Sequence, residues 1–198
     1  MITYTQWLNK DGKIEADLTV TKLTDEKFLV VVTDTMHRHA ETWIKRHAGE
    51  DDHIFVTDVT SGYGQLNIQG PKSRELLQSI TTVDLSNEAF PFRAARYIDI
   101  GFARALCVRI TYVGELGFEI NVPAGFGRHV WEQVWAAGQP HGITPYGTET
   151  MHVLRAEKGF IIVGQDTDGT VTPNDAGLDW AVGKKKPDFV GKRSLARP

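Results

Sequence analysis

The chain has very little of three things that would each point to a particular class of protein. Cys107 is the only cysteine among 198 residues, so no internal disulfide can form and a reducing compartment is favoured. No apolar run approaches the ~20 residues that a helix needs to cross a bilayer. The N-terminus has no basic segment followed by an apolar one, so no secretion signal is recognised. These absences predict a cytoplasmic protein with no membrane partner.

Charge, histidine and glycine patterns exclude further classes of site. The 22 basic and 25 acidic residues leave a net charge of −3, with no basic excess to neutralise nucleic-acid phosphates. The seven histidines lack metal-ligand spacing, because His37 and His39 would lie on different faces of one helix. No G-x-G-x-x-G fingerprint is present, so we expect neither a flavin nor a nicotinamide site. The basic run at residues 184–186 is interpreted as a solvated loop.

Hydrophobic periodicity predicts interleaved strands and helices. Residues 14–23 alternate apolar and polar side chains, which indicates a half-buried strand, and residues 27–33 indicate a second, more fully buried one. Further strands are expected at 53–59, 63–69, 94–102, 105–112 and 118–122, and helices at 34–47, after Gly70-Pro71, at 126–137 and at 146–157. The short connections favour antiparallel pairing, so the predicted class is α+β, with a largely antiparallel sheet and flanking helices.

Residues 111–119, Thr-Tyr-Val-Gly-Glu-Leu-Gly-Phe-Glu, form the most informative segment. Gly114 and Gly117 allow a sharp bend or a close approach to a flat partner, and Tyr112 and Glu119 could face one pocket from its two sides. A carboxylate accepts two parallel hydrogen bonds. The 2-amino-4-oxopyrimidine edge of a pterin offers two such donors side by side, so this segment is a candidate folate site.

The chain resembles the folate-binding aminomethyltransferase family of the glycine-cleavage T-protein, and more closely the C-terminal part of the sarcosine oxidase alpha subunit and its dehydrogenase relatives. Ordered blocks carry the resemblance over nearly the whole chain: residues 4–9, 12–20, 111–119, 154–166, 172–178 and 184–192. Several ordered blocks are much harder to obtain by chance than one short motif.

The resemblance implies roles for particular residues. Asp17 matches the family's catalytic aspartate, and Tyr4, Tyr112 and Glu119 match residues that contact tetrahydrofolate. In the sarcosine-type enzymes a separate flavin site oxidises the amine, and the folate domain captures the carbon as 5,10-methylenetetrahydrofolate. The resemblance therefore implies tetrahydrofolate as cofactor and flavoprotein subunits of an amine oxidase complex as partners.

Departures from the family leave alternatives open. Ala16-Asp17 replaces the paired aspartates common in T-proteins, and Met151 stands where those proteins use an arginine, which favours the sarcosine branch. We expect a truncated folate-binding domain at residues 1–160 and, at 161–198, a connection towards a missing C-terminal barrel. Missing walls would expose apolar surface and promote self-association. A non-catalytic folate-binding or structural module and a folate-dependent demethylase remain alternatives.

Overall fold

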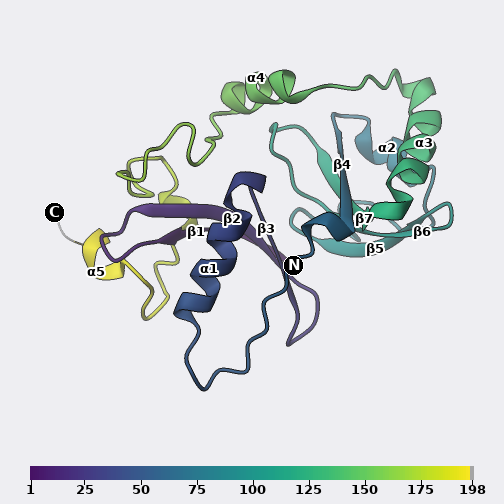
Figure 1. Cartoon of the computed structure of the whole chain (residues 1–198). Coiled ribbons are helices and arrows are strands. Elements are labelled where there is room, and N and C mark those ends of the chain that lie inside the picture. The colour runs from purple at the N-terminus through teal and green to yellow at the C-terminus, as the bar shows by residue number, and fades with distance from the viewer. Residues whose placement is uncertain (197–198) are drawn as a thin grey trace. The chain divides into compact units, whose positions relative to one another are not determined.

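The computed structural model describes residues 1–196 and divides into two compact units (Figure 1). The four-stranded unit comprises residues 1–2 and 59–160, and the three-stranded unit comprises residues 3–58 and the chain from 161 onward. The chain thus enters the four-stranded unit after residue 58 and leaves it after residue 160. The predicted division into 1–160 and 161–198 stays a prediction.

The three-stranded unit is built on the antiparallel hairpin that the sequence predicts. Its sheet has the order β1 (Ile2–Leu8), β2 (Ile14–Lys22) and β3 (Phe28–Val32), and Lys22 pairs with Phe28 beside the turn. A single 3-10 turn (Asp34–Met36) leads into α1 (His37–His47). The turn between β1 and β2 is organised by Asn9, whose Oδ1 accepts hydrogen bonds from the N–H groups of Asp11 and Lys13.

The C-terminal segment completes the core of the three-stranded unit. It contains only a 3-10 turn (Asp179–Ala181) and the short α5 (Lys192–Leu195) in the part that the structure describes. Leu8, Ile14 and Val163 form the buried cluster, and Phe189 and Leu195 pack against it. The Ile14 N–H donates to the carbonyl of Val171, which ties this segment to the start of β2.

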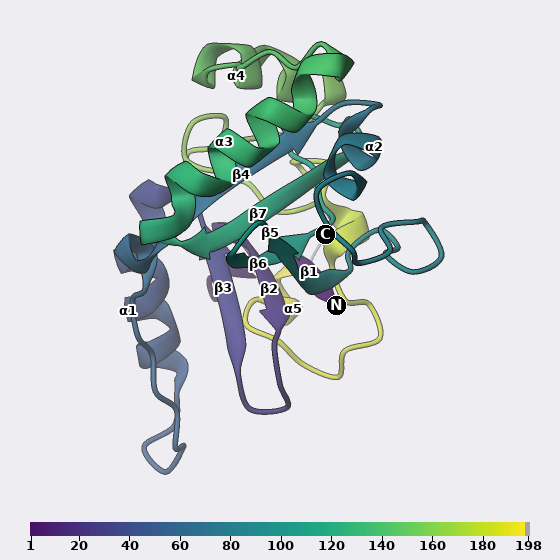
Figure 2. The same ribbon diagram turned by 90° about the vertical axis from the view of Figure 1, so that its right-hand side faces the viewer.

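The four-stranded unit is an antiparallel sheet covered on one face by helices (Figure 2). The strands have the order β4-β7-β6-β5: β4 (Tyr63–Gln69), β7 (Gly117–Pro123), β6 (Ala103–Val108) and β5 (Ala95–Ile100). The covering helices are α2 (Ser73–Gln78) and α3 (Gly127–Gly138), whereas α4 (Thr148–Lys158) follows them in the chain with most of its residues exposed. Phe118, Ile120 and Val122 are fully buried with Val130 of α3, because alternate residues of β7 face the core.

The α+β class and the antiparallel pairing are confirmed. Cys107 lies in β6, next to its last residue, with no exposed surface, as expected for a small buried hydrophobe, and burial raises the pKa of its thiol to about 12. Because its thiol stays protonated at neutral pH, Cys107 is inert as a nucleophile.

Two predictions about strands were wrong. Residues 53–59 form no strand: they are irregular and almost all exposed, because no neighbouring strand pairs with them. The strand at residues 27–33 is less buried than expected. It is β3, at the edge of its sheet, and Phe28 is 53% exposed.

Candidate functional site

Glu119 lies on the central strand β7, on the polar face of the four-stranded sheet. It pairs directly with Asn67 of β4, so the two side chains share a face, and Gln65 lies two residues along β4 on that same face. Gln65 Nε2 donates a hydrogen bond of 2.9 Å to Glu119 Oε2. The strand therefore fixes the backbone of Glu119, and the amide of Gln65 orients its carboxylate.

Burial makes Glu119 an unusual carboxyl group. Its side chain is only partly accessible, and the loss of hydration raises its pKa to about 7. The charge of Glu119 also acts on Tyr146, whose pKa is raised first by burial and then by that charge. Gln65 and Tyr146 both line a pocket of about 640 Å³, together with the stacked indoles of Trp131 and Trp135. A half-ionised carboxylate thus lies beside residues of a ligand-sized pocket.

The two glycines of the segment have different structural roles. Gly114 adopts a left-handed conformation (φ 82°) in the bend, and a Cβ there would meet Lys158 at 2.5 Å. Gly117 begins β7, and a Cβ there would collide with the side chain of Gln69. Thr111 holds the bend, because its hydroxyl donates to Gln69 Oε1 at 3.0 Å and accepts from the Gly114 N–H at 3.1 Å. The predicted bend is present at Gly114, whereas the close neighbour of Gly117 is the Gln69 side chain and the approach to a flat partner stays a prediction.

Tyr112 lies in this same loop between β6 and β7 and is half-buried. Tyr112 therefore lies in the loop before the bend and Glu119 in β7 after it, within one unit.

Asp17 and Tyr4 form a pair in the three-stranded unit. Tyr4 comes from β1 and Asp17 from the adjacent β2, and the phenol donates a hydrogen bond of 3.1 Å to Asp17 Oδ2. Asp17 alternates with the buried Ala16 and Leu18, which hold the strand against the core. Burial raises the pKa of Asp17, and the hydrogen bond from Tyr4 opposes that rise.

An aromatic wall stands beside this pair. The ring of Trp180 stacks on Tyr4 with centroids 5.7 Å apart and an angle of 21° between the planes, and Trp180 is 66% exposed. Tyr4 is thus held by a carboxylate that accepts its hydrogen bond and by an indole that stacks on its ring, so this residue is fixed even though it lies near the N-terminus.

The structure groups the sequence candidates as Tyr4 with Asp17 in one unit and Tyr112 with Glu119 in the other. That the two acids face a common hollow stays a prediction. Three residues beside these candidates were not predicted from the sequence: Gln65, Tyr146 and Trp180. Each is distant along the chain from its partner, as Gln65 is from Glu119 by 54 residues, and no local pattern marks such a contact.

Among residues 1–196, no helix has the length and the apolar composition needed to cross a membrane. In the same range, His, Cys, Asp and Glu side chains nowhere gather in groups of three that could hold a metal ion.

The chain is similar to proteins of three named kinds. It is 48% identical over 194 residues to the sarcosine oxidase subunit alpha of Corynebacterium sp. (strain U-96), which covers 94% of this chain and 20% of that protein. It is 37% identical to the aminomethyltransferase of Oceanobacillus iheyensis, covering 97% of this chain and 53% of that protein. It is 33% identical to mouse mitochondrial dimethylglycine dehydrogenase, covering 95% and 22%. The chain therefore spans about a fifth to about half the length of these relatives.

A solved structure and a family model agree with these similarities. The glycine cleavage system aminomethyltransferase T from Bartonella henselae has a TM-score of 0.82 and 25% identity, and the match covers 98% of this chain and 52% of that one. The family model described as the GCVT N-terminal domain matches residues 1–186. With its antiparallel sheets and its match over nearly the whole length, the chain belongs to the GCVT N-terminal domain family.

Proposed function

We propose that this chain is the tetrahydrofolate-binding domain of a system that oxidises N-methyl amines, and that it receives the one-carbon unit of the oxidised amine. The family supports this proposal, and so do relatives named sarcosine oxidase and dimethylglycine dehydrogenase, whose named substrates both carry N-methyl groups. The observation that carries it is the partly buried carboxylate of Glu119, oriented by Gln65 on a central strand.

Glu119 supplies the recognition of the pterin ring. The 2-amino group and the adjacent ring N–H of a pterin point the same way, and an ionised carboxylate can accept from both. The bond from Gln65 occupies one lone pair of Oε2 and fixes the plane of the carboxylate. Tyr112 would line the same site from the loop before the bend. Because the pKa of Glu119 is about 7, folate binding should weaken below neutral pH as the carboxyl becomes protonated.

Asp17 supplies the proton-handling group. Tetrahydrofolate, when bound, would supply the nitrogen nucleophiles that capture the iminium carbon, giving 5,10-methylenetetrahydrofolate, the free amine and one proton. A carboxylate can stabilise the cationic iminium and relay the proton to the amine. Tyr4 holds Asp17 in place for this role.

The partners would be flavoprotein subunits that produce the iminium. The relative from Corynebacterium sp. U-96 is described as a heterotetrameric sarcosine oxidase, and this chain matches 20% of its alpha subunit. Oxidation of the amine would then take place outside the residues described here, and the carbon would pass to folate on this chain.

Calorimetry with tetrahydrofolate tests the binding role. Glu119→Gln keeps the size of the side chain and its bond from Gln65 but cannot accept two hydrogen bonds as an anion. Hydrogen bonds to charged groups contribute about 1.5–3 kcal/mol, so affinity should fall by about one to two decades. Glu115→Gln, at an exposed position of the same loop, is the control and should leave affinity unchanged. Equal affinity of wild type and Glu119→Gln contradicts the proposal.

The partition of the one-carbon unit tests the catalytic role. With a flavoprotein that oxidises sarcosine, Asp17→Asn should keep tetrahydrofolate affinity but release more formaldehyde and less methylenetetrahydrofolate than wild type. Asp11→Asn, in the exposed turn between β1 and β2, should behave like wild type. If Asp17→Asn binds folate and partitions carbon like wild type, the proposed catalytic role of Asp17 is contradicted.

A further inference from the structure

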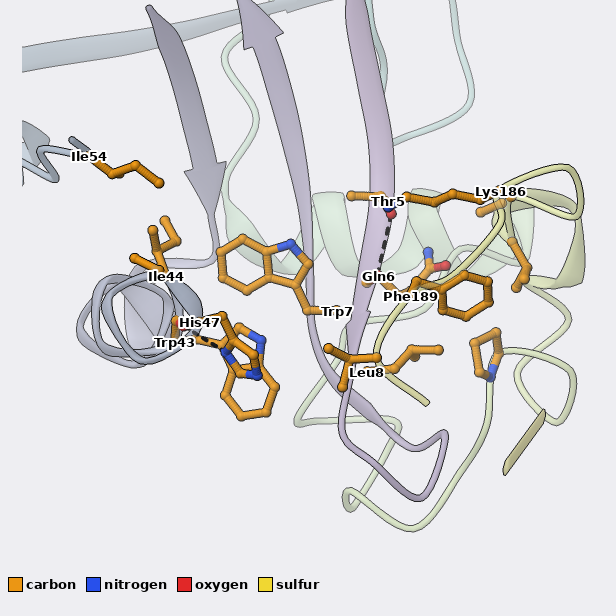
Figure 3. A pocket seen from close by; sticks show the side chains of 16 residues that line it. Thr5, Gln6, Trp7, Leu8, Trp43, Ile44, His47, Ile54, Lys186 and Phe189 are labelled. Carbon is orange, nitrogen blue, oxygen red and sulfur yellow. Dashed lines mark hydrogen bonds between the residues drawn. The ribbon is translucent and has the colours of Figure 1, made fainter. Parts of the chain in front are cut away.

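A second pocket lies entirely within the three-stranded unit. It measures about 520 Å³, which is within the usual range of small-molecule sites. Its walls come from the edge strand β1, from α1 and from the C-terminal segment between residues 173 and 190 (Figure 3). None of the four candidate residues of the proposed folate site lines it.

One wall of this pocket is aromatic and apolar. Figure 3 shows Trp7 of β1 directed towards Ile44 and Trp43 of α1. Trp43 is fixed by its own helix, because His47 packs on its ring at 4.5 Å and the His47 Nδ1 lies 2.9 Å from the Trp43 carbonyl oxygen. Two indoles and an aliphatic side chain form a surface on which a flat apolar group can pack.

Gln6 provides a polar group on the other face of β1, because neighbouring residues of a strand point to opposite faces, so a ligand that contacts both Trp7 and Gln6 crosses the exposed edge of this strand. The Gln6 side chain is directed towards Phe189 in Figure 3, and the residue is only 9% exposed. The Gln6 Nε2 atom is buried and has no hydrogen-bond partner among the described residues. A buried amide donor without a partner costs about 1–3 kcal/mol, so native proteins seldom keep one without a reason. Because the Nε2 atom is itself covered, the Gln6 side chain must turn before an acceptor on a ligand can reach it and remove this cost.

The ionisable groups around the pocket are all basic. Of the sixteen residues that line it, His47 and Lys186 are the two that can carry a positive charge, and no carboxylate is among them. Lys186 sits in a fixed turn: its N–H donates to the Gly183 carbonyl, and Lys192 Nζ donates to the carbonyls of Lys186 and Pro187. The predicted solvated loop is present, because residues 184–186 are all exposed, and of the three lysines Lys186 is the one that also lines the pocket.

We propose that this pocket binds a small organic monocarboxylate with a flat apolar body. The body would pack against Trp7 and Trp43, and the carboxylate would accept a hydrogen bond from Gln6 Nε2 and pair with the ammonium group of Lys186. Apolar packing supplies most of the contact area, and the two polar groups fix the orientation of the ligand. The site is separate from Glu119, so its test is independent of folate binding.

Titration of the ¹⁵N-labelled chain with indole-3-butyrate tests this assignment. The indole N–H signals of Trp7 and Trp43 should shift on titration, whereas those of Trp131 and Trp135, in the four-stranded unit, should not. The neutral primary amide of the same compound should bind at least about tenfold more weakly, because hydrogen bonds to a charged group are about twice as strong as neutral ones and the pairing with Lys186 is lost.

Charge variants give matched controls. Lys186→Gln should weaken binding of indole-3-butyrate about tenfold, whereas Lys185→Gln, at an exposed neighbour outside the pocket, should not. Gln6→Leu should weaken it as well, and circular dichroism reports whether that variant remains folded. Equal binding of acid and amide, equal effects of the two lysine variants, or unshifted Trp7 and Trp43 signals would each overturn the proposal.

Discussion

At the scale of single residues, Glu119 links pH to stability. Its pKa is about 7 in the folded chain and near the ordinary 4.5 in the unfolded chain, so the folded state holds its proton to higher pH. The free energy of unfolding should therefore fall as pH rises from about 4.5 to 7, by up to about 3 kcal/mol from this group. In urea unfolding, Glu119→Gln should have a higher free energy of unfolding than wild type at pH 8, and this difference should disappear at pH 4.5. A gain that is the same at both pH values rules out burial of the charge as its cause.

Tyr4 and Asp17 offer a second residue-scale prediction. The phenol donates to the ionised carboxylate and so lowers the pKa of Asp17 against the effect of burial. Tyr4→Phe removes this bond but keeps the ring that stacks on Trp180, so the pKa of Asp17 should rise further. A carbon-13 NMR titration of the Asp17 carboxyl measures it. Tyr63→Phe, at an exposed position in the other unit, is the control. An unchanged or lower pKa of Asp17 in Tyr4→Phe would contradict a stabilising hydrogen bond from Tyr4 to the ionised carboxylate.

At the scale of elements, Gly117 of β7 leaves room for the Gln69 side chain of the neighbouring strand β4. It pairs with Gln69, and a Cβ at position 117 would occupy the space of the Gln69 side chain, which in turn holds Thr111. Gly117→Ala should destabilise the chain by about 1–3 kcal/mol, as overpacking does elsewhere. Gly125→Ala, where a Cβ meets open space, should change stability by less than about 0.5 kcal/mol.

The double variant Gly117→Ala/Gln69→Ala separates a clash from other causes. Removing the Gln69 side chain makes room for the new methyl group, so the double variant should lose less stability than the two single variants added together. Simple additivity in thermal unfolding would mean that the two positions do not interact, contrary to the contact in the structure.

The elements also show where sequence reasoning succeeds and fails. Residues 14–22 alternate apolar and polar side chains, and this local pattern predicts β2 whatever the rest of the chain does. Residues 53–59 have similar composition but find no strand to pair with, and pairing is a non-local property. The burial of β3 was overestimated for the same reason, because its place at the sheet edge is decided by strand order.

At the scale of the whole molecule, exposed aromatic side chains predict self-association. Phe55 is 91% exposed and Phe102 is 72% exposed, and the small net charge of −3 gives weak mutual repulsion. Light scattering should show a mass that grows with concentration, most strongly near the isoelectric point of about 6.2. Phe55→Ser should reduce the growth, whereas Val153→Ser, at an exposed helical position of α4, should reduce it less. A constant monomer mass at all concentrations would contradict this expectation.

The sequence by itself determined the α+β class, the hairpin of β2 and β3, the bend at Gly114 and the burial of Cys107, because each follows from local periodicity, glycine conformation or an apolar run. Only the tertiary structure placed Gln65 against Glu119, Trp180 against Tyr4, and an unpaired amide of Gln6 in a basic pocket. These contacts join residues far apart in the chain. Such contacts depend on strand order and register, which the packing of the core fixes and no local pattern encodes.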